Sequence, residues 1–429
     1  MKITGKRLFI SFLIAVLMMI PLIAAFLYFS VDDRVKIKST PPVFVNTSNI
    51  MRLDSTVLTP DAVTAFVNSR MQKAGVAGMA ISIINDHSLV YQQYSGMKDT
   101  RKNEPFTPGT IFDAASFSKT IFADVVLQLA EENVIHLDTP LYKYLEEPLH
   151  AFKTNTFQQL LGANFIDYTD LEGDERYKQI TPRMCLSHTT GFPNWRWLED
   201  DDRLRIKFDP GSHYAYSGEG IFLLQLILEE VTGRDFEEIA VEKVFSPLNM
   251  DRTSYVWQRA YEGHHARGHS IDGNDLGIPK RNLPSASGSM STTLEDYTIF
   301  FMNVLSQKER RHRDLLTPQI RITSKQQFGP NATVDTNEHD KIRLSYGLGF
   351  GLYETPYGKA FFKEGHDDGW QHYAVGFPEK GTGLIMMSNS DNAESIFKYL
   401  IEYCLGNPYT PWYWEGYFPY DSSTYVHTR

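Results

Sequence analysis

Segments with the pattern of β-strands lie near both ends of this chain, and helical segments fill its middle. Residues 79–84 and 89–91 are apolar runs around the turn Asn85-Asp86-His87, a pattern typical of a β-hairpin. From about residue 117 to 340 the periodic segments are mostly helical. Strand-like segments then return at 344–352, 359–363, 373–377 and 383–387, and a last helix is expected at 394–405.

This arrangement constrains the fold more than any other feature. Strands from the two ends need each other as partners, so the fold expected is α+β. We predict an antiparallel sheet built from N- and C-terminal segments and flanked by helices, with a mostly helical second lobe. The helices expected in that lobe include 121–130 and 220–231.

Composition supports a folded chain and excludes several classes of protein. With 42% hydrophobic and 22% charged residues among 429, the chain is neither disordered nor a collagen or a coiled coil. The net charge of −10 argues against binding to nucleic acid phosphates. Two cysteines, Cys185 and Cys404, are too few for a disulfide framework.

The N-terminus predicts a membrane segment. Three basic residues precede an apolar run from Leu8 to Phe29 that is long enough to span a bilayer. We favour an uncleaved signal anchor over a cleaved signal peptide, which would release the protein. The bulk of the chain would then lie on the periplasmic or extracytoplasmic side. The domains expected are an anchor or signal at 1–30, a linker at 31–57, a folded domain at 58–406 and an aromatic tail at 407–429.

A serine and a lysine three residues apart are the first candidate for chemistry. A serine hydroxyl becomes a nucleophile when a base takes its proton, and a lysine can be that base where its pKa is lowered. The spacing of Ser116 and Lys119 stacks them on one face of a helix that is expected to begin at Ser116. Two other pairs have this spacing without such surroundings: Ser95 with Lys98, and Ser395 with Lys398.

Two weaker motifs follow in the chain. Tyr214 and Tyr216 come after a Pro-Gly turn, just before a helical segment, and a tyrosine near lysines can transfer protons. The alternative is that both tyrosines are core residues. Lys363-Glu364-Gly365 ends an expected strand, where the lysine would bind a substrate carboxylate or only meet solvent.

Taken together and in this order, the three motifs resemble the serine β-lactamase and penicillin-binding protein superfamily, specifically its class C branch. Further similar segments include Leu137-Asp138-Thr139-Pro140, residues 181–193, 245–250 and 287–292. The resemblance covers roughly residues 58–406. It implies a β-lactamase/transpeptidase-like fold and no cofactor.

The resemblance also implies acyl transfer by a hydrolase. Ser116 would attack a carbonyl, Lys119 and Tyr216 would move protons, and Lys363 would tune Tyr216. The backbone N–H groups of Ser116 and of His366, which follows Gly365, would form the oxyanion hole. The partner expected is a small molecule or peptide with an ester or amide bond.

Two departures from the family pattern bear on the substrate. Gly218 stands where the family has an asparagine that contacts substrate amides, and Glu364 replaces a threonine that helps to bind carboxylates. We therefore expect an esterase or amidase, including D-peptidases, more than a β-lactamase. The alternative is a non-catalytic or very slow penicillin-binding or sensor module.

Three other features of the sequence bear on function. Segment 146–180 is interpreted either as part of a lid or substrate wall or as an inert insertion. The aromatic tail is expected to pack on the domain, rather than to contact a membrane or a partner. No metal site is predicted, because neither histidine cluster has a known ligand spacing. The clusters are His264, His265 and His269, and His366, Asp367, Asp368 and His372.

Overall fold

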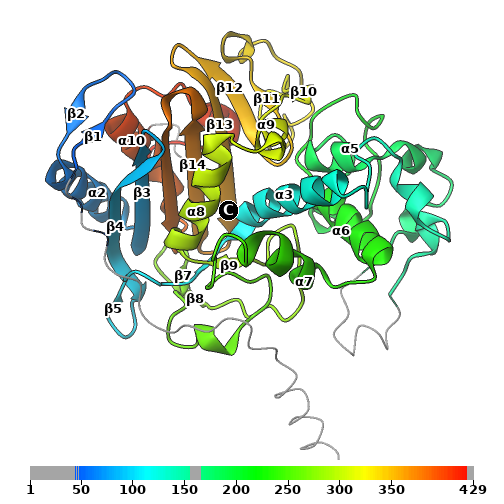
Figure 1. The fold of residues 1–429 in the computed structure, drawn as a ribbon, viewed down its shortest axis with the longest axis horizontal. Helices are drawn as coiled ribbons and strands as arrows, with labels where there is room; N and C mark the ends of the chain where they lie inside the picture. Colours follow the sequence, from blue (N-terminus) through cyan, green and yellow to red (C-terminus); the bar gives the residue numbers. More distant parts are fainter. Residues whose placement is uncertain (1–43, 45, 47, 155–165, 423–429) are drawn as a thin grey trace, which may run out of the picture.

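The main sheet joins the two ends of the chain in the computed structural model, which describes residues 44, 46, 48–154 and 166–422. Its nine strands are all antiparallel to their neighbours, and the order is β10-β11-β12-β13-β14-β15-β3-β4-β5. The C-terminal strand β15 lies beside the N-terminal strand β3 at the centre (Figure 1). The bounds are β3 (Gly78–Asn85), β4 (Ser88–Asp99), β5 (Glu104–Pro105), β10 (Ile320–Arg321), β11 (Ser345–Tyr346), β12 (Gly351–Thr355), β13 (Gly358–Asp367), β14 (Trp370–Phe377) and β15 (Thr382–Ser388).

Helices cover both faces of this sheet. On one face, α2 (Pro60–Ala74) packs against α10 (Glu394–Leu405). On the other face α8 (Leu294–Ser306) contacts β3 and β15, and α3 (Ser118–Glu131) runs from the sheet into a helical lobe (Figure 1). The other α-helices of the described residues are α5 (Pro182–Leu186), α6 (Gly218–Thr232), α7 (Phe236–Ala240), α9 (Arg310–Leu315) and α11 (Trp412–Glu415). Three two-stranded ribbons complete the strands: β1 (Ile50–Met51) with β2 (Val57–Leu58), β6 (Phe112–Asp113) with β9 (Ser291–Thr292), and β7 (Gly268–His269) with β8 (Asp275–Gly277).

This architecture confirms the predicted fold class, and local sequence explains most of its elements. Thr59 caps α2, and Gly75 ends that helix in a left-handed conformation. Asp86 and His87 both have positive φ, which suits the tight turn between β3 and β4. Helix α10 occupies the predicted residues 394–405.

The predicted strand at 344–352 is wrong, because the chain forms two strands, β11 and β12, with a turn between them. Gly349 has a φ of +88°, and a Cβ there would lie 2.8 Å from the Cβ of Ala123 on α3. The backbone therefore turns where α3 passes close to the sheet. The predicted helix start at Ser116 is also wrong, because Ser116 lies in a 3₁₀ turn, η1 (Ala115–Phe117), that precedes α3.

The predicted membrane localisation is contradicted by the structure. Within 48–154 and 166–422, no helix is both long enough and apolar enough to cross a bilayer. The longest of these helices, α2 and α6, have 15 residues each, whereas a membrane span needs about 20. The apolar run in residues 1–30 lies outside the described residues.

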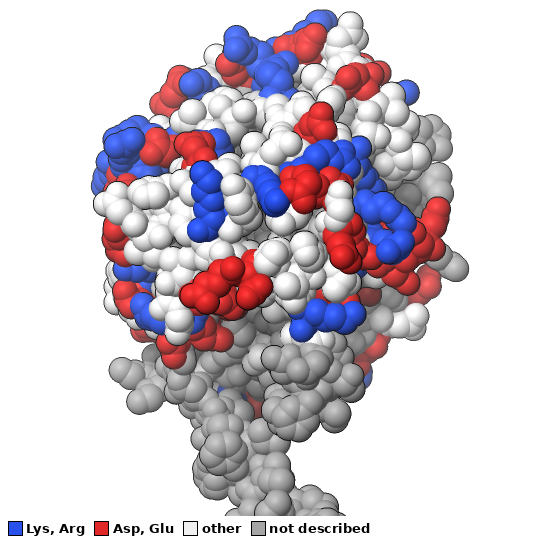
Figure 2. Space-filling view, turned by 90° about the vertical axis from the view of Figure 1, so that its right-hand side faces the viewer, with Lys and Arg blue, Asp and Glu red and all other residues white. Residues whose placement is uncertain are grey.

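Charges are mixed on the side of the molecule formed by the helical lobe. Figure 2 shows basic and acidic side chains interspersed over the described part of this face. Ion pairs within the helical lobe include Arg203 with Asp170 and Arg205 with Asp201. The face therefore presents no single dominant sign of charge where it is described.

The central β15–β3 junction provides a test of the fold. Ile385 on β15 is fully buried and pairs with Ser82 on β3. Replacing Ile385 with alanine leaves a cavity, so we expect the free energy of unfolding to fall by about 2–5 kcal/mol in urea titrations. The matched control is Ile299→Ala on α8, which is 41% exposed and should change stability by less than about 1 kcal/mol. Equal losses in the two variants would contradict this placement of the core.

Candidate active site

Ser116 stands at a corner between the ribbon β6–β9 and helix α3. The preceding residue, Ala115, has a φ of +45°, a left-handed conformation that is uncommon for residues other than glycine. The carboxyl of Asp113 accepts the Ala115 N–H at 2.8 Å. Ser118, at the start of α3, donates its hydroxyl to the Ala115 carbonyl. These contacts fix the backbone on both sides of Ser116.

Lys119 lies one helical turn after Ser116, and their side chains meet. Lys119 Nζ donates to Ser116 Oγ at 2.9 Å and to the Ser287 carbonyl at 2.6 Å. The side chain is 1% exposed. Burial, and then the charge of Lys363, hold the pKa of Lys119 well below its usual value. Lys119 can therefore be neutral at physiological pH and act as a base toward Ser116.

Tyr216 reaches the same point from the segment before α6. Ser217 fixes this segment by donating to the Pro193 carbonyl and capping α6 at Gly220. The Tyr216 hydroxyl accepts from Lys363 Nζ at 3.1 Å, and Ser116 is near enough to lower the pKa of Tyr216. Burial raises the pKa of Tyr216, and the charge of Lys363 opposes that rise. The tyrosine can therefore keep its proton and donate it during a reaction.

Lys363 comes from β13 in the main sheet and is fully buried. Burial alone would lower its pKa, but the charge of Glu364 and contact with Tyr216 outweigh burial and raise the pKa of Lys363. Its Nζ lies 2.9 Å from Glu364 Oε1. Lys363 therefore stays charged while Lys119 loses its proton, although the two amines lie close together.

Two of the predicted substrate-binding residues, Gly365 and His366, continue β13 beside the nucleophile. A Cβ on Gly365 would lie 3.2 Å from the Ala114 carbonyl and 3.0 Å from the ring of His372. Glycine therefore lets β13 lie close to the backbone that precedes Ser116. The His366 side chain is 58% exposed and lies 3.8 Å from Glu394. The oxyanion-hole role of the Ser116 and His366 N–H groups stays a prediction.

The other two, Gly218 and Glu364, have neighbours that the motifs did not indicate. A Cβ on Gly218 would lie 2.5 Å from the ring of Trp195, so the indole occupies the space of the missing side chain. Glu364 is 4% exposed, and its carboxyl accepts from Gln327 as well as from Lys363. Neither Trp195 nor Gln327 lies in a motif, and no pattern in the sequence points to them.

His188 is a further neighbour that the motif analysis missed. It lies within the segment 181–193, which was noted only for its resemblance to the family. Its ring is 4.2 Å from that of Tyr216, and its Nδ1 accepts from the Ser217 N–H. Burial, followed by the charges of Lys119 and Lys363, holds the pKa of His188 well below 6.5. A neutral His188 supports Tyr216 without adding a positive charge beside Lys363.

The Arg281 side chain forms an ion-pair bridge between two aspartates near Ser116. Arg281 pairs with Asp113, which holds the Ala115 N–H, and with Asp367, which follows His366. Burial raises the pKa of Asp113 to about 6, and Arg281 limits that rise. The bridge therefore ties the end of β13 to the backbone before the nucleophile.

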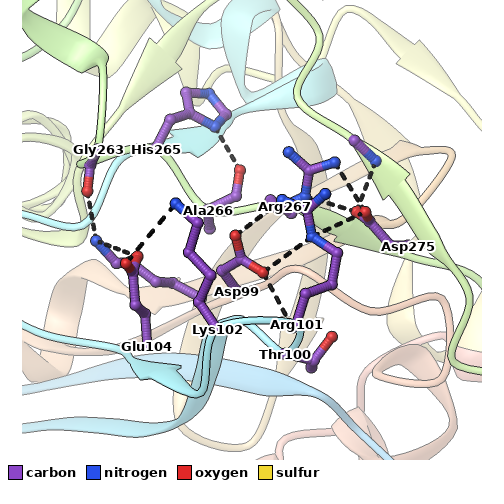
Figure 3. Close-up of polar contacts among 12 residues, drawn as sticks. Asp99, Thr100, Arg101, Lys102, Glu104, Gly263, His265, Ala266, Arg267 and Asp275 are labelled. Carbon is purple, nitrogen blue, oxygen red and sulfur yellow. Dashed lines mark hydrogen bonds and ion pairs between the residues drawn. The ribbon is translucent and has the colours of Figure 1, made fainter.

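Residues 263–277, which precede Arg281 in the chain, contact the edge of the main sheet through ion pairs. Figure 3 shows Arg101 and Arg267 both pointing at Asp275. The Arg267 guanidinium binds Asp275 through two hydrogen bonds, at 2.7 and 2.8 Å. Asp99 at the end of β4 pairs with Arg101. These contacts hold residues 263–277 against β4 and β5.

The predicted histidine clusters have hydrogen-bonding partners within the protein. His269 contacts Thr100, and His372 contacts the Asp113 carbonyl at 2.6 Å. Over the residues that the structure describes, no group of three or more potential metal ligands is arranged to hold an ion. The segment 146–180 includes residues 155–165, which lie outside the described residues, and its role stays a prediction.

Comparison with known proteins identifies the family. A family model described as Beta-lactamase matches residues 63–403, which is most of the chain. The chain belongs to the Beta-lactamase family. Membership supports an activity of the serine hydrolase type, and it agrees with the superfamily that the motifs indicated.

Individual relatives of this Beta-lactamase family chain are distant. Protein flp of Staphylococcus aureus strain MRSA252 is 22% identical over 359 residues, which cover 80% of this chain and 64% of that protein. The chain thus spans less than two thirds of that relative's length. Two solved structures share the fold: the octameric penicillin-binding protein homologue from Pyrococcus abyssi, and D-alanine carboxypeptidase AmpC from Burkholderia cenocepacia. The Pyrococcus abyssi structure has a TM-score of 0.64 and 21% identity, and the match covers 82% of this chain and 79% of that one. The Burkholderia cenocepacia structure has a TM-score of 0.61 and 20% identity, and the match covers 80% of this chain and 98% of that one.

The Arg281 bridge predicts a pH-dependent loss of stability. Without Arg281 the pKa of Asp113 should rise above 6, so Asp113 would be a buried, unpaired charge at pH 8 and neutral at pH 5. We expect Arg281→Leu to lower the free energy of unfolding by about 1–3 kcal/mol at pH 8 and by much less at pH 5. Stability falls with rising pH because the pKa of Asp113 in the folded protein lies above its usual value of 3.8. Between these two pKa values the folded protein holds a proton that the unfolded chain has released, so a higher pH favours unfolding. Urea unfolding at both pH values measures this, and Asp113→Asn in the same background should remove the difference.

Proposed function

We propose that this protein is a serine hydrolase that acts through an acyl-enzyme on an ester or amide substrate. The observation that carries the proposal is the buried amine of Lys119, 2.9 Å from Ser116 Oγ, in a site where Lys363 keeps the second positive charge. A buried neutral lysine at that distance can take the serine proton. A structural role alone would not require two buried amines beside one serine.

The contacts support a specific order of proton transfers. Lys119 takes the Ser116 proton as Oγ forms a bond to the carbonyl carbon, and the carbonyl electrons become an oxyanion. The N–H groups of Ser116 and His366 would bind that oxyanion. As the bond to the leaving group breaks, Tyr216 donates its proton to that group, and the proton on Lys119 returns to Tyr216. Water then attacks the acyl carbon and gives a proton to Lys119. The bond from that carbon to Oγ breaks, the acyl group leaves as a carboxylic acid, and the proton returns from Lys119 to Oγ.

The surroundings of the site favour an apolar substrate that carries no carboxylate. Trp195 stacks on Trp197 and lies 5.9 Å from Lys119 Nζ, while Phe328 is 44% exposed and packs 5.4 Å from Tyr216. These rings offer apolar contact beside the reacting groups. Glu364 places a carboxyl next to Lys363, which disfavours binding of a second carboxylate there. We therefore propose an esterase or amidase more than a β-lactamase, and a D-peptidase only for substrates without that carboxylate contact.

The first test is covalent labelling of the full-length protein with a fluorophosphonate and with a fluorescent penicillin. We expect the fluorophosphonate to label Ser116, found by peptide mapping, and the penicillin to label it slowly or not at all. Ser116→Ala should abolish labelling, whereas Ser95→Ala, from a decoy pair with the same spacing, should not. Labelling by neither reagent in folded protein would overturn the proposal and favour a non-catalytic module. Rapid penicillin labelling with stable adducts would favour a slow penicillin-binding protein.

The second test concerns Gly218 and Trp195. Gly218→Asn alone should lose activity, because the new side chain collides with the indole. We expect Gly218→Asn combined with Trp195→Ala to favour a p-nitroanilide over the matching p-nitrophenyl ester by about tenfold more than Trp195→Ala alone. The measurement is the ratio of kcat/KM for the two substrates. An unchanged ratio would mean that residue 218 does not contact the scissile amide.

A further inference from the structure

The residue after Lys363 is a buried acid that is held from two sides. Glu364 Oε1 accepts from Lys363 Nζ and from Gln327 Nε2, each at 2.9 Å. Glu364 and Gln327 are 4% and 3% exposed, so both lie away from solvent. Both bonds reach the same oxygen, and Oε2 has no hydrogen-bonding partner among the described residues, so the cation and the amide at Oε1 are what fix the carboxyl.

This acid belongs to a continuous set of contacts that ends at the nucleophile. Lys363 Nζ donates to Glu364 and also to the Tyr216 hydroxyl, at 3.1 Å. Ser116 in turn lies near enough to Tyr216 to lower the pKa of the tyrosine, and it accepts from Lys119 Nζ at 2.9 Å. The position of the Lys363 ammonium is therefore set by Glu364 on one side and by Tyr216 on the other.

The aromatic tail holds Gln327, the residue that binds Glu364 on the side away from Ser116. The Gln327 N–H donates to the Trp414 carbonyl at 2.9 Å, and Trp414 Nε1 donates to Ser324 Oγ at 3.1 Å. Trp414 is 1% exposed and packs against Tyr214 and Phe362. Helix α11 thus packs on the domain and holds the loop that carries Gln327.

The negative charge of Glu364 acts on the buried ammonium of Lys363. A fully buried ammonium loses its proton unless a negative group compensates for the lost hydration. The charged or titratable groups that act on Lys363 are Tyr216 and Glu364, with Lys119 and His188 on the lobe side and Glu415 on α11. Burial, and then the charge of Glu364, raise the pKa of Glu415 well above its usual value. Glu364 is therefore the acid positioned to compensate Lys363.

We propose that Glu364 is a positioning residue for Lys363 and, through it, for Tyr216, and that the C-terminal turn α11 fixes Glu364 by way of Gln327. The inference rests on the proposed hydrolase function for its kinetic consequences. It gives the aromatic tail a part in the active site, although the tail contributes no reacting group. It also assigns Glu364 a role behind the substrate site.

The kinetic test is the pH dependence of kcat/KM in Glu364→Gln. The carboxylate charge raises the pKa of both Lys363 and Lys119. Activity needs Lys119 neutral and Lys363 charged, so removing the charge should move both limbs of the profile to lower pH. At the alkaline side of the wild-type optimum we expect a loss of about 10- to 100-fold. The control is Glu354→Gln on the neighbouring strand β12, whose side chain is 48% exposed and pairs with Arg343.

A second readout does not depend on turnover. Lysine labelled with 13C at Cε reports its own titration by NMR, and the Lys363 signal is assigned by its loss in Lys363→Met. We expect the pKa of Lys363 to fall in Glu364→Gln and to stay unchanged in Glu354→Gln. An unchanged pKa in folded Glu364→Gln would overturn the inference. If wild-type protein is not labelled at Ser116, the proposed function fails, and this titration still decides the role of Glu364.

The contribution of the tail is tested through Gln327. Gln327→Leu removes the amide that holds Glu364 and should shift the profile in the same direction as Glu364→Gln, by a smaller amount. Gln326→Leu, in the adjacent position of the loop, should leave the pH profile unchanged.

Trp414→Phe removes the indole hydrogen bond to Ser324 and should shift the pH profile as Gln327→Leu does. The control is Tyr413→Ala, because Tyr413 is 61% exposed on the same turn, and it should have no effect. Equal profiles for Gln327→Leu and Gln326→Leu would remove the tail from the proposal.

Discussion

Two lysine amines buried beside one serine are the constraint that organises this molecule. Both amines are buried, and two buried positive charges that lie near each other would each destabilise the other. The structure resolves this by giving the two amines different neighbours: Lys119 meets neutral oxygens of Ser116 and Ser287, while Lys363 meets the carboxyl of Glu364. One amine is thereby left as a base and the other as a fixed positive charge. The corner before α3, the end of β13 and the segment before α6 are all held in place where they supply this pair.

The parts of the site that follow from short spacings could be predicted from the sequence. Ser116 and Lys119 are one helical turn apart, and the resemblance of the three motifs to the class C branch implied that Tyr216 and Lys363 would join them. The hairpin β3–β4, the helix α10 and the antiparallel sheet followed from periodicity and turn residues in the same way. The left-handed Ala115 and the turn at Gly349 did not, because each depends on a close approach to a distant element. The contacts of Trp195, Gln327 and Arg281 also join residues that are far apart in the chain, and a single sequence holds no local signal for them.

The two departures from the family pattern have a different meaning in the structure than in the sequence. In the sequence alone, Gly218 is the loss of an asparagine side chain that contacts substrate amides, and Glu364 is a negative charge where the family binds carboxylates. In space, the indole of Trp195 fills the position beside Gly218, and Lys363 with Gln327 surrounds Glu364. Trp195 therefore occupies the space beside Gly218, and Glu364 Oε1 has two hydrogen-bonding partners, whereas Glu364 Oε2 has none among the described residues. Both altered positions have specific contacts with residues outside the three motifs.

The pairing of β15 with β3 also has a consequence for the order in which the site can form. Ser116 and Lys119 are synthesised well before Lys363 and β15. Until those later segments fold, β3 has no neighbour on that side, and Lys119 lacks both the burial and the nearby charge of Lys363 that lower its pKa. A chain truncated before β13 would therefore carry a lysine with an ordinary pKa beside Ser116. The low pKa of Lys119 thus depends on strands that are made long after it.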